Sequence, residues 1–246
     1  MVSSSTESLW QGWEAMPNGM QLLAEIDEAM APWWPRIFGY HLLKLGALSL
    51  DLDSSASKIN HTFTLFPDHR ADVVADFDQL PLKSSSVDAV AMPLLLEFEQ
   101  DPYRILREVD RVLVSGGYLV ICGINPFSSA YSGKLFPKYQ TQWPWSGRFF
   151  MPARVKDWLG LLGYQLVDER RLGFHAFMPE WDYPKICRKW QQRLLPGTGL
   201  LYLFVARKLD TPLTPIAPKN KKRVAGWQPA ATGGFSGRHM KQSDNE

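Results

Sequence analysis

Cysteine is scarce in this sequence, and its placement excludes two kinds of site. The chain has 246 residues and two cysteines, Cys122 and Cys187, which lie far apart. Neither belongs to a CxxC or Cys/His cluster, the patterns that mark disulfide-rich domains and zinc sites. The sequence therefore predicts neither a disulfide framework nor a metal site, and it fits a reducing cytoplasm.

Long apolar runs are also lacking. The first twenty residues contain Ser, Glu, Asn and two Trp, without the basic start and apolar core of a secretory signal. No other stretch approaches the about 20 apolar residues that a membrane helix needs. We therefore expect no membrane span and a cytoplasmic location.

An excess of charge of one sign is missing too. Lys+Arg 27 against Asp+Glu 25 leaves a formal net charge of +2, which provides no general field for holding a polyanion. The basic group Lys219, Lys221, Lys222 and Arg223 suits nucleic acid, anionic lipid or simple solubility. Because no GxGxxG turn exists, a nicotinamide cofactor is not expected. A small molecule remains the expected substrate, and the oligomeric state is not indicated.

The remaining composition is that of a globular protein. Hydrophobic residues make up 45% of the chain, enough for one core. Apolar runs predict strands and helical spacing predicts helices. The expected strands are 42–48, 61–66, 72–75, 87–92, 118–122, 164–172 and 199–208. The expected helices are 20–30, 102–113, 152–162 and 181–195. We expect an N-terminal helical cap over 1–37, an α/β domain over 38–209, and a disordered basic tail over 210–246.

The strongest local pattern is a strand, helix and strand over 87–122. Asp101 is a good helix N-cap and Pro102 suits the first helical position. One apolar stripe follows within 105–113, and Ser115 to Gly117 are expected to end the helix. A unit of this kind predicts a parallel sheet with right-handed crossovers, and hence a doubly wound, Rossmann-like α/β fold with helices on both faces.

The segment Asn125 to Met151 is rich in Pro, Gly, Ser and aromatic residues and is interpreted as one long loop. Loops of this length are usually functional or mobile. Its aromatic side chains suit either the wall of an apolar or planar acceptor site or a simple cover for the sheet. Asn125-Pro126-Phe127 follows the fifth strand and is interpreted as the start of a substrate-side loop.

The residues from Ala75 to Ile121 resemble the small class I S-adenosylmethionine (SAM)-dependent methyltransferases related to the ubiquinone-biosynthesis type. The match consists of five elements in order: Asp76, Leu80-Pro81, Val87 to Val90, Leu96-Glu97-Phe98, and Glu108 to Gly117 with Ser115 in place of Pro. Weaker similarity extends over about 38–208. The resemblance implies a mostly parallel seven-stranded sheet with an antiparallel last strand, and SAM as cofactor.

The resemblance also implies a cofactor site at the carboxyl ends of the strands. Asp76 would accept a hydrogen bond from the adenine amino group and Phe77 would pack on the ring. Met92, Pro93 and Leu94 would border the methionine portion, and Gly46 would let backbone approach the cofactor. Glu97 is interpreted as holding a loop or helix start. No catalytic residue is assigned, although His175 and Tyr131 are available should a base be needed.

Two departures from the family pattern lie in the first loop and after the second strand. Lys44 stands at the expected acidic position, and Leu48 and Leu50 stand where glycines are expected. These leucines would occupy ligand space or force the loop outward. Asp68 is the nearest candidate for a ribose-binding acid, but it lies too close to Asp76 for the usual intervening helix.

Two functions therefore follow from the sequence. The first is a SAM-dependent methyltransferase (EC 2.1.1) acting on an unidentified small-molecule acceptor. The alternative is a methyltransferase-like protein that has lost SAM binding and serves as a binding or scaffold module.

Overall fold

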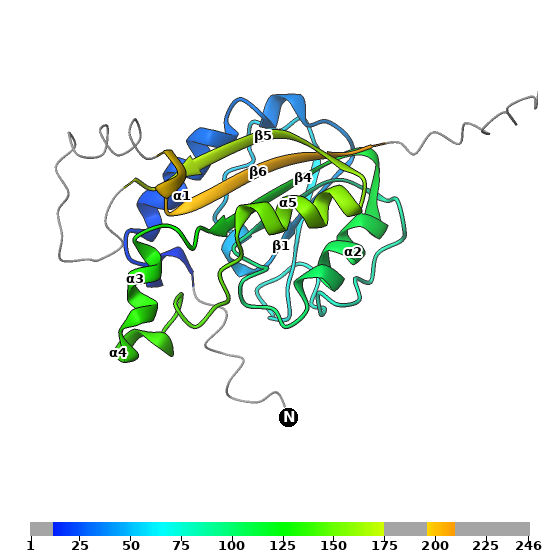
Figure 1. Cartoon of the computed structure of the whole chain (residues 1–246). Coiled ribbons are helices and arrows are strands. Elements are labelled where there is room, and N and C mark those ends of the chain that lie inside the picture. The colour runs from blue at the N-terminus through cyan, green and yellow to red at the C-terminus, as the bar shows by residue number, and fades with distance from the viewer. Residues whose placement is uncertain (1–11, 175–195, 210–246) are drawn as a thin grey trace, which may run out of the picture. The chain divides into compact units, whose positions relative to one another are not determined.

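The computed structural model describes residues 12–174 and 196–209, so the expected helix 181–195, His175 and the expected tail 210–246 lie outside the described residues (Figure 1). The strands are β1 (His41–Leu45), β2 (His61–Leu65), β3 (Val87–Pro93), β4 (Leu113–Ile124), β5 (Tyr164–Leu172) and β6 (Leu201–Lys208). The α-helices are α1 (Gly19–Met30), α2 (Pro102–Val112), α3 (Ala130–Leu135), α4 (Pro137–Gln140) and α5 (Pro152–Leu161). Short 3-10 helices occupy Trp13–Ala15, Trp34–Arg36, Ala47–Ser49 and Pro196–Thr198. None of the described helices is long and apolar enough to cross a membrane.

The strands form one sheet in the order β2-β1-β3-β4-β6-β5. β1 pairs in parallel with β2 and β3, and β3 in parallel with β4. β6 is antiparallel to both of its neighbours, β4 and β5. The doubly wound, mostly parallel fold with an antiparallel last strand is therefore confirmed.

The predicted count of seven strands is wrong for the described residues, which form six. The expected strand 72–75 is reduced to a single parallel bridge between Leu65 and Val73. Asp72 explains the loss, because its carboxylate accepts hydrogen bonds from the backbone N–H and the hydroxyl of Thr64, both at 2.8 Å. A side chain thus occupies part of the edge of β2 that a further strand would need.

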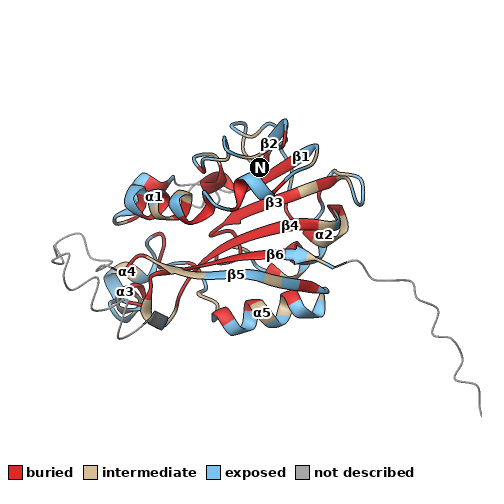
Figure 2. Cartoon of the chain, turned by 90° about the horizontal axis from the view of Figure 1, so that it is seen from above, coloured by how far each residue is buried: buried red, intermediate tan, exposed pale blue. Residues whose placement is uncertain are grey.

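Helices cover both faces of the sheet because side chains alternate along each strand. Leu42 of β1 belongs to the core beneath α1, while the next residue, Leu43, belongs to the core beneath α2 and α5. Figure 1 shows α2 and α5 on the near side of the sheet, and Figure 2 shows the buried strands between these layers. α1 therefore covers one face of the sheet, as its helical spacing predicts.

α2 begins as expected, with the Asp101 carboxylate accepting a hydrogen bond from Arg104 N at 3.1 Å. Its end was predicted wrongly: β4 already begins at Leu113, so Ser115 to Gly117 lie inside the strand. The strand pairing is irregular there, shifting between Val87 and Ala89 of β3. Gly117 is required because a Cβ would lie 2.8 Å from the carbonyl oxygen of Asp88.

The Glu108-Arg111 signature at the end of α2 has a structural role. Arg111 Nη2 lies 2.8 Å from a carboxylate oxygen of Glu108. The same guanidinium donates to the carbonyl oxygens of Leu80 and Leu82, each at 2.9 Å. Glu108 in turn accepts from Leu80 N at 3.1 Å. This pair therefore ties α2 to the Leu80-Pro81 turn.

The segment 125–151 is not one uninterrupted loop, because it contains α3 and α4. Pro137 occupies the first turn of α4, where its fixed φ suits a helix. Trp143 and Trp145 are buried, and Trp145 Nε1 donates to the carbonyl oxygen of Ala130 at 3.0 Å. These two indole rings therefore hold the segment together.

Candidate functional site

The parallel strands end together at one edge of the sheet, the carboxyl edge. In doubly wound folds ligands bind outside this edge. Gly46 follows β1, Leu94 follows β3, and Gly123 lies near the end of β4. Because β6 is antiparallel, its first residues reach the same edge, where Tyr202 pairs with Gly123. The edge thus brings together residues from distant parts of the sequence.

Gly46 is the glycine that the first loop requires. Its φ is +87°, a backbone conformation that favours glycine. Its N–H donates to the carbonyl oxygen of Leu65 at 3.1 Å, and a Cβ would lie 3.3 Å from Leu95 Cδ1. The chain then turns into the 3-10 helix Ala47–Ser49, where Ser49 Oγ donates to the Gly46 carbonyl. Gly46 is buried, with the side chain of Leu95 on the side where a Cβ would lie.

The two leucines of the first loop take separate directions. Leu48 is buried in the core beneath α1, and its carbonyl oxygen accepts from Trp13 Nε1 at 2.8 Å. Leu50 packs at the border of the core on the opposite face. Each of these side chains packs against the protein core. The sequence predicts that they occupy ligand space or push the loop outward, and their packing accounts for both leucines without either effect.

Lys44 serves as an internal tie of the same loop. Its side chain is buried and its Nζ donates to the carbonyl oxygen of Leu52 at 2.7 Å. Burial lowers the pKa of Lys44, and the carboxylates of Asp53, Asp27 and Asp51 oppose that shift. The ammonium group of Lys44 is therefore hydrogen-bonded to the backbone of its own loop and attracted by nearby carboxylates.

Met92, Pro93 and Leu94 run along the carboxyl edge with buried side chains. Leu94 has a φ of +49°, a left-handed conformation that a bulky side chain seldom adopts. Its N–H donates to the carbonyl oxygen of Cys122 at 2.8 Å, which continues the pairing of β3 with β4. Strained backbone of this kind is concentrated at functional sites, and here it turns the chain sharply at the strand end.

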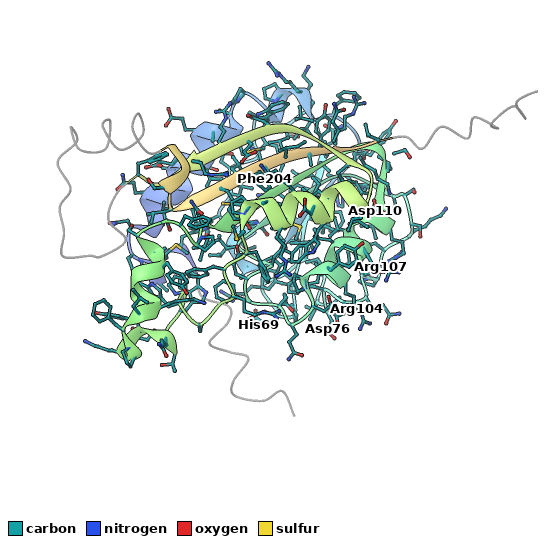
Figure 3. All side chains as sticks on the ribbon, in the orientation of Figure 1. His69, Asp76, Arg104, Arg107, Asp110 and Phe204 are labelled. Carbon is teal, nitrogen blue, oxygen red and sulfur yellow. The ribbon has the colours of Figure 1, made fainter. Side chains whose placement is uncertain are left out.

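In the view of Figure 3, Asp76 is drawn toward the end of α2 that carries Arg104 and away from the end that carries Asp110. Its neighbour Phe77 is 3% exposed and buried on the α2 side, so Phe77 has little free ring surface for stacking. The neighbourhood of Asp76 is acidic, since it also contains Asp78 and Glu99. Burial, and then the carboxylates of Asp78 and Asp76, raise the pKa of Glu99 to about 7. This favours a ligand that donates hydrogen bonds.

Glu99 was not predicted from the sequence as part of this group. It comes two residues after the Leu-Glu step, in a stretch that predicts only the approach to α2. The backbone carbonyls of Glu99 and Gln100 both accept hydrogen bonds from Arg148 Nη2. These contacts hold Glu99 near Asp76 and could not be inferred from local pattern.

Asp68 is committed to its own loop. Its carboxylate lies 3.1 Å from Arg70 Nε and 3.3 Å from His69 Nδ1, and it accepts from Arg70 N at 2.9 Å. Hydrogen bonds from Arg70 lower the pKa of Asp68. A ribose hydroxyl would have to compete with Arg70 for this carboxylate.

A buried polar group that the sequence did not predict lies beside Gly123. A Cβ at Gly123 would lie 2.1 Å from Tyr202 Oη and 2.6 Å from Glu97 Oε1, so both side chains crowd this glycine. Glu97 Oε1 accepts from Ile124 N at 2.8 Å, and the Glu97 carbonyl accepts from Arg148 N at 2.6 Å. Glu97 therefore links the exits of β3 and β4, in agreement with its interpretation as a loop-holding residue.

The same group is buried and incompletely hydrogen-bonded within the described residues. Among the described residues, neither Glu97 Oε2 nor Tyr202 Oη has a hydrogen-bond partner. Burial raises the pKa of Glu97 to about 7. Burial, and secondarily the Glu97 carboxylate, raises the pKa of Cys122 and of Tyr202 well above their ordinary values. The thiol and the phenol therefore stay neutral near pH 7, while Glu97 titrates.

The side chains considered as bases or acceptor contacts are placed less favourably. Asn125 is buried, and its amide nitrogen donates to the carbonyl oxygens of Gly197 and Gly199 at 2.7 and 2.9 Å. Its amide oxygen accepts from Phe127 N at 3.1 Å. This amide is used to hold the approach to β6, so it is no acceptor for a substrate nitrogen. Tyr131 is 46% exposed on α3.

Comparisons with known proteins agree with this geometry. Residues 40–121 match the family model of the methyltransferase domain. The chain is 35% identical over 216 residues to the uncharacterized protein YafS of Escherichia coli (strain K12). The aligned residues cover 86% of this chain and 88% of that protein. Similar solved structures include the methyltransferase in a complex with the Haloferax volcanii activator Trm112, with a TM-score of 0.54 and 16% identity over 79% of this chain and 98% of that chain. A SAM-dependent methyltransferase from Archaeoglobus fulgidus has a TM-score of 0.53 and 16% identity over 76% and 94%. At such identities the structural similarity concerns the fold.

Proposed function

The chain belongs to the class I SAM-dependent methyltransferase family, and we propose that it binds SAM at the carboxyl edge and transfers its methyl group to a small-molecule acceptor. The observation that carries the proposal is the backbone at that edge, where Gly46 follows β1 and Leu94 follows β3, each with a positive φ. Asp76 adds a carboxylate in an acidic neighbourhood with Asp78 and Glu99. Backbone that can be approached closely, beside acceptors for an amino group, fits an adenosyl ligand.

When bound, SAM would supply a sulfonium methyl group: the acceptor's nucleophilic atom would bond to the methyl carbon as the carbon–sulfur bond breaks, and the sulfur would leave as a thioether. Such a displacement gains most from holding the two partners in contact and excluding water. In this proposal Asp76 and Glu99 accept from the adenine amino group, and the backbone of Met92 to Leu94 borders the methionine portion. In the same proposal the backbone of Gly46 contacts the cofactor. Phe77 lies between the adenine and the core on the α2 side.

The acceptor is proposed to enter from the side of the aromatic segment 125–151. Phe98 stacks on Trp143 with ring centroids 5.9 Å apart, directly after Glu97 in the chain. This pair borders the exit of β3 with apolar rings, which suits an apolar or planar acceptor. The proposal assigns no side chain as a base, because in-line methyl transfer does not require one.

Substituting Asp76 with alanine is expected to weaken SAM binding by about tenfold or more. The reason is the loss of a charge-assisted hydrogen bond, worth about 1.5 to 3 kcal/mol. Isothermal titration calorimetry with SAM and with S-adenosylhomocysteine on the full chain measures the effect. The Asp157→Ala variant removes an exposed carboxylate from α5 and should bind within twofold of the wild type.

Two results would contradict the proposal at different levels. If the wild type shows no binding up to millimolar SAM, the methyltransferase function fails and a scaffold role remains. If the wild type binds but Asp76→Ala and Asp157→Ala are equal, the adenine contact is wrongly assigned while the function stands.

A further inference from the structure

Apolar side chains are exposed together on the segment that follows β4. Phe127 is 66% exposed, Tyr131 46%, Leu135 69% and Phe136 52%. Tyr131 and Leu135 lie four residues apart on α3 and therefore share a helix face. These four residues form the α3 patch. Single exposed apolar residues are ordinary, but a group of large ones on consecutive turns indicates a binding surface.

The charges of the segment 125–151, which carries the α3 patch, are of one sign. This segment contains no Asp or Glu, whereas Lys134, Lys138 and Arg148 fall within it. Arg148 is engaged by the backbone carbonyls of Glu99 and Gln100, so Lys134 and Lys138 are the cations next to the patch in the chain. Lys138 is exposed on α4, directly after the patch. Lys134 is half-buried, with its Nζ over the ring of Phe149 at 4.3 Å from the centroid. The patch is therefore apolar with a cationic border.

We propose that the α3 patch is a docking surface for the anionic surface of a lipid bilayer. Aromatic and leucine side chains enter the boundary between headgroups and acyl chains, and flanking lysines attract anionic lipid. The cationic border complements an anionic surface, and the exposed Leu135 and Phe136 suit the acyl boundary beneath the headgroups. The exposed Leu135 and Phe127 favour lipid over nucleic acid, which binds aromatic rings by stacking along a basic groove.

The α3 patch lies close in the chain to the carboxyl edge of the sheet. α3 begins six residues after the end of β4, the strand that ends beside Glu97 and Tyr202 at the carboxyl edge. Figure 1 shows α3 and α4 standing away from the sheet, where they are free to contact a surface. This part of the inference rests on the proposed function: a bilayer contact here would deliver a lipid-soluble acceptor to the methyl-transfer edge.

The test is flotation of the full chain with vesicles, without SAM. The wild type is expected to float with phosphatidylcholine vesicles containing phosphatidylglycerol, and on the order of tenfold less with phosphatidylcholine alone. The double variant Leu135→Ser/Phe136→Ser should reduce the bound fraction about fivefold or more. The control is Leu161→Ser/Val167→Ser, which removes two exposed apolar side chains from α5 and β5. Leu161 is 77% exposed and Val167 is 44% exposed. This variant should bind vesicles within twofold of the wild type.

Three outcomes overturn the proposal. They are no flotation of the wild type, equal loss in both double variants, or binding of single-stranded RNA that competes with the vesicles. If Leu135→Ser/Phe136→Ser does not fold by circular dichroism, Lys138→Glu at an exposed position replaces it, and unchanged flotation of that variant also overturns the proposal. The cations at 219–223 are present in every variant, so they cannot cause a difference between them. SAM calorimetry on the same samples tests the methyltransferase function separately.

Discussion

Replacing Gly123 with alanine is expected to lower the free energy of unfolding by about 2 to 3 kcal/mol, the upper part of the range for overpacked cores. The new Cβ would lie 2.1 Å from Tyr202 Oη and 2.2 Å from Tyr202 Cζ. Tyr202 is fully buried and packs against Phe204 with ring centroids 4.9 Å apart, so the phenol cannot swing away freely. Chemical denaturation of both proteins measures the difference.

The control for this change is Gly160→Ala on the exposed side of α5. A Cβ there would meet no atom within 4 Å, so alanine should raise stability by about 0.5 to 1 kcal/mol through helix propensity. The double variant Gly123→Ala/Tyr202→Leu should lose less than the sum of its single variants, because leucine lacks the atoms that clash. Two results would show that Tyr202 does not crowd this strand. One is a double variant whose loss of unfolding free energy equals the sum of the single losses. The other is a Gly123→Ala variant that is no less stable than Gly160→Ala.

Replacing Glu97 with glutamine is expected to remove a loss of stability that the wild type suffers as pH rises. Burial raises the pKa of Glu97 from its ordinary value of 4.5 to about 7, so folding favours the protonated form. The stabilisation is complete below about pH 4.5 and is lost as pH rises through about 7. At about 1.4 kcal/mol per pH unit the loss amounts to about 3 kcal/mol.

The measurement is the free energy of unfolding at several pH values between 4.5 and 8.5. Glu97→Gln and the wild type should be nearly equal at the acid end, since a protonated carboxyl and an amide have similar shapes. By pH 8 the variant should be the more stable protein by about 3 kcal/mol. Glu28→Gln on the exposed side of α1 should keep the wild-type profile. Parallel profiles for the wild type and Glu97→Gln would mean that Glu97 is already ionised, with a partner, below pH 5.

Both predictions concern a buried group that no local pattern indicates. Glu97 and Tyr202 are distant in the sequence and meet only because β4 and β6 are neighbours at the carboxyl edge. Sequence patterns gave Glu97 a loop-holding role through the Leu-Glu step, but nothing near Tyr202 distinguishes it from other aromatic residues of a buried strand. Contacts of this kind depend on strand order and register, which a one-dimensional pattern does not contain.

The cofactor residues illustrate the same division. Gly46 was expected from the family pattern, and its positive φ agrees with the need for glycine there. Asp76 was expected from the family pattern, whereas Glu99 became its neighbour only through the turn between β3 and α2 and the contacts of Arg148. The binding roles of Gly46, Asp76, Phe77 and Met92 to Leu94 remain predictions that SAM titration tests.

The sequence by itself determined the class of fold. Apolar runs of strand length and one strongly amphipathic helix can bury their apolar sides in few ways, and a βαβ unit then requires parallel strands. Only the tertiary structure decided where polar side chains compete with that pattern. Asp72 bonds the edge of β2 and reduces a predicted strand to a bridge, and Lys44 and Leu48 find partners within the protein. The physical reason is that hydrogen-bond partners and packing neighbours are set by distance in space, whereas periodicity reports only which side of an element a residue occupies.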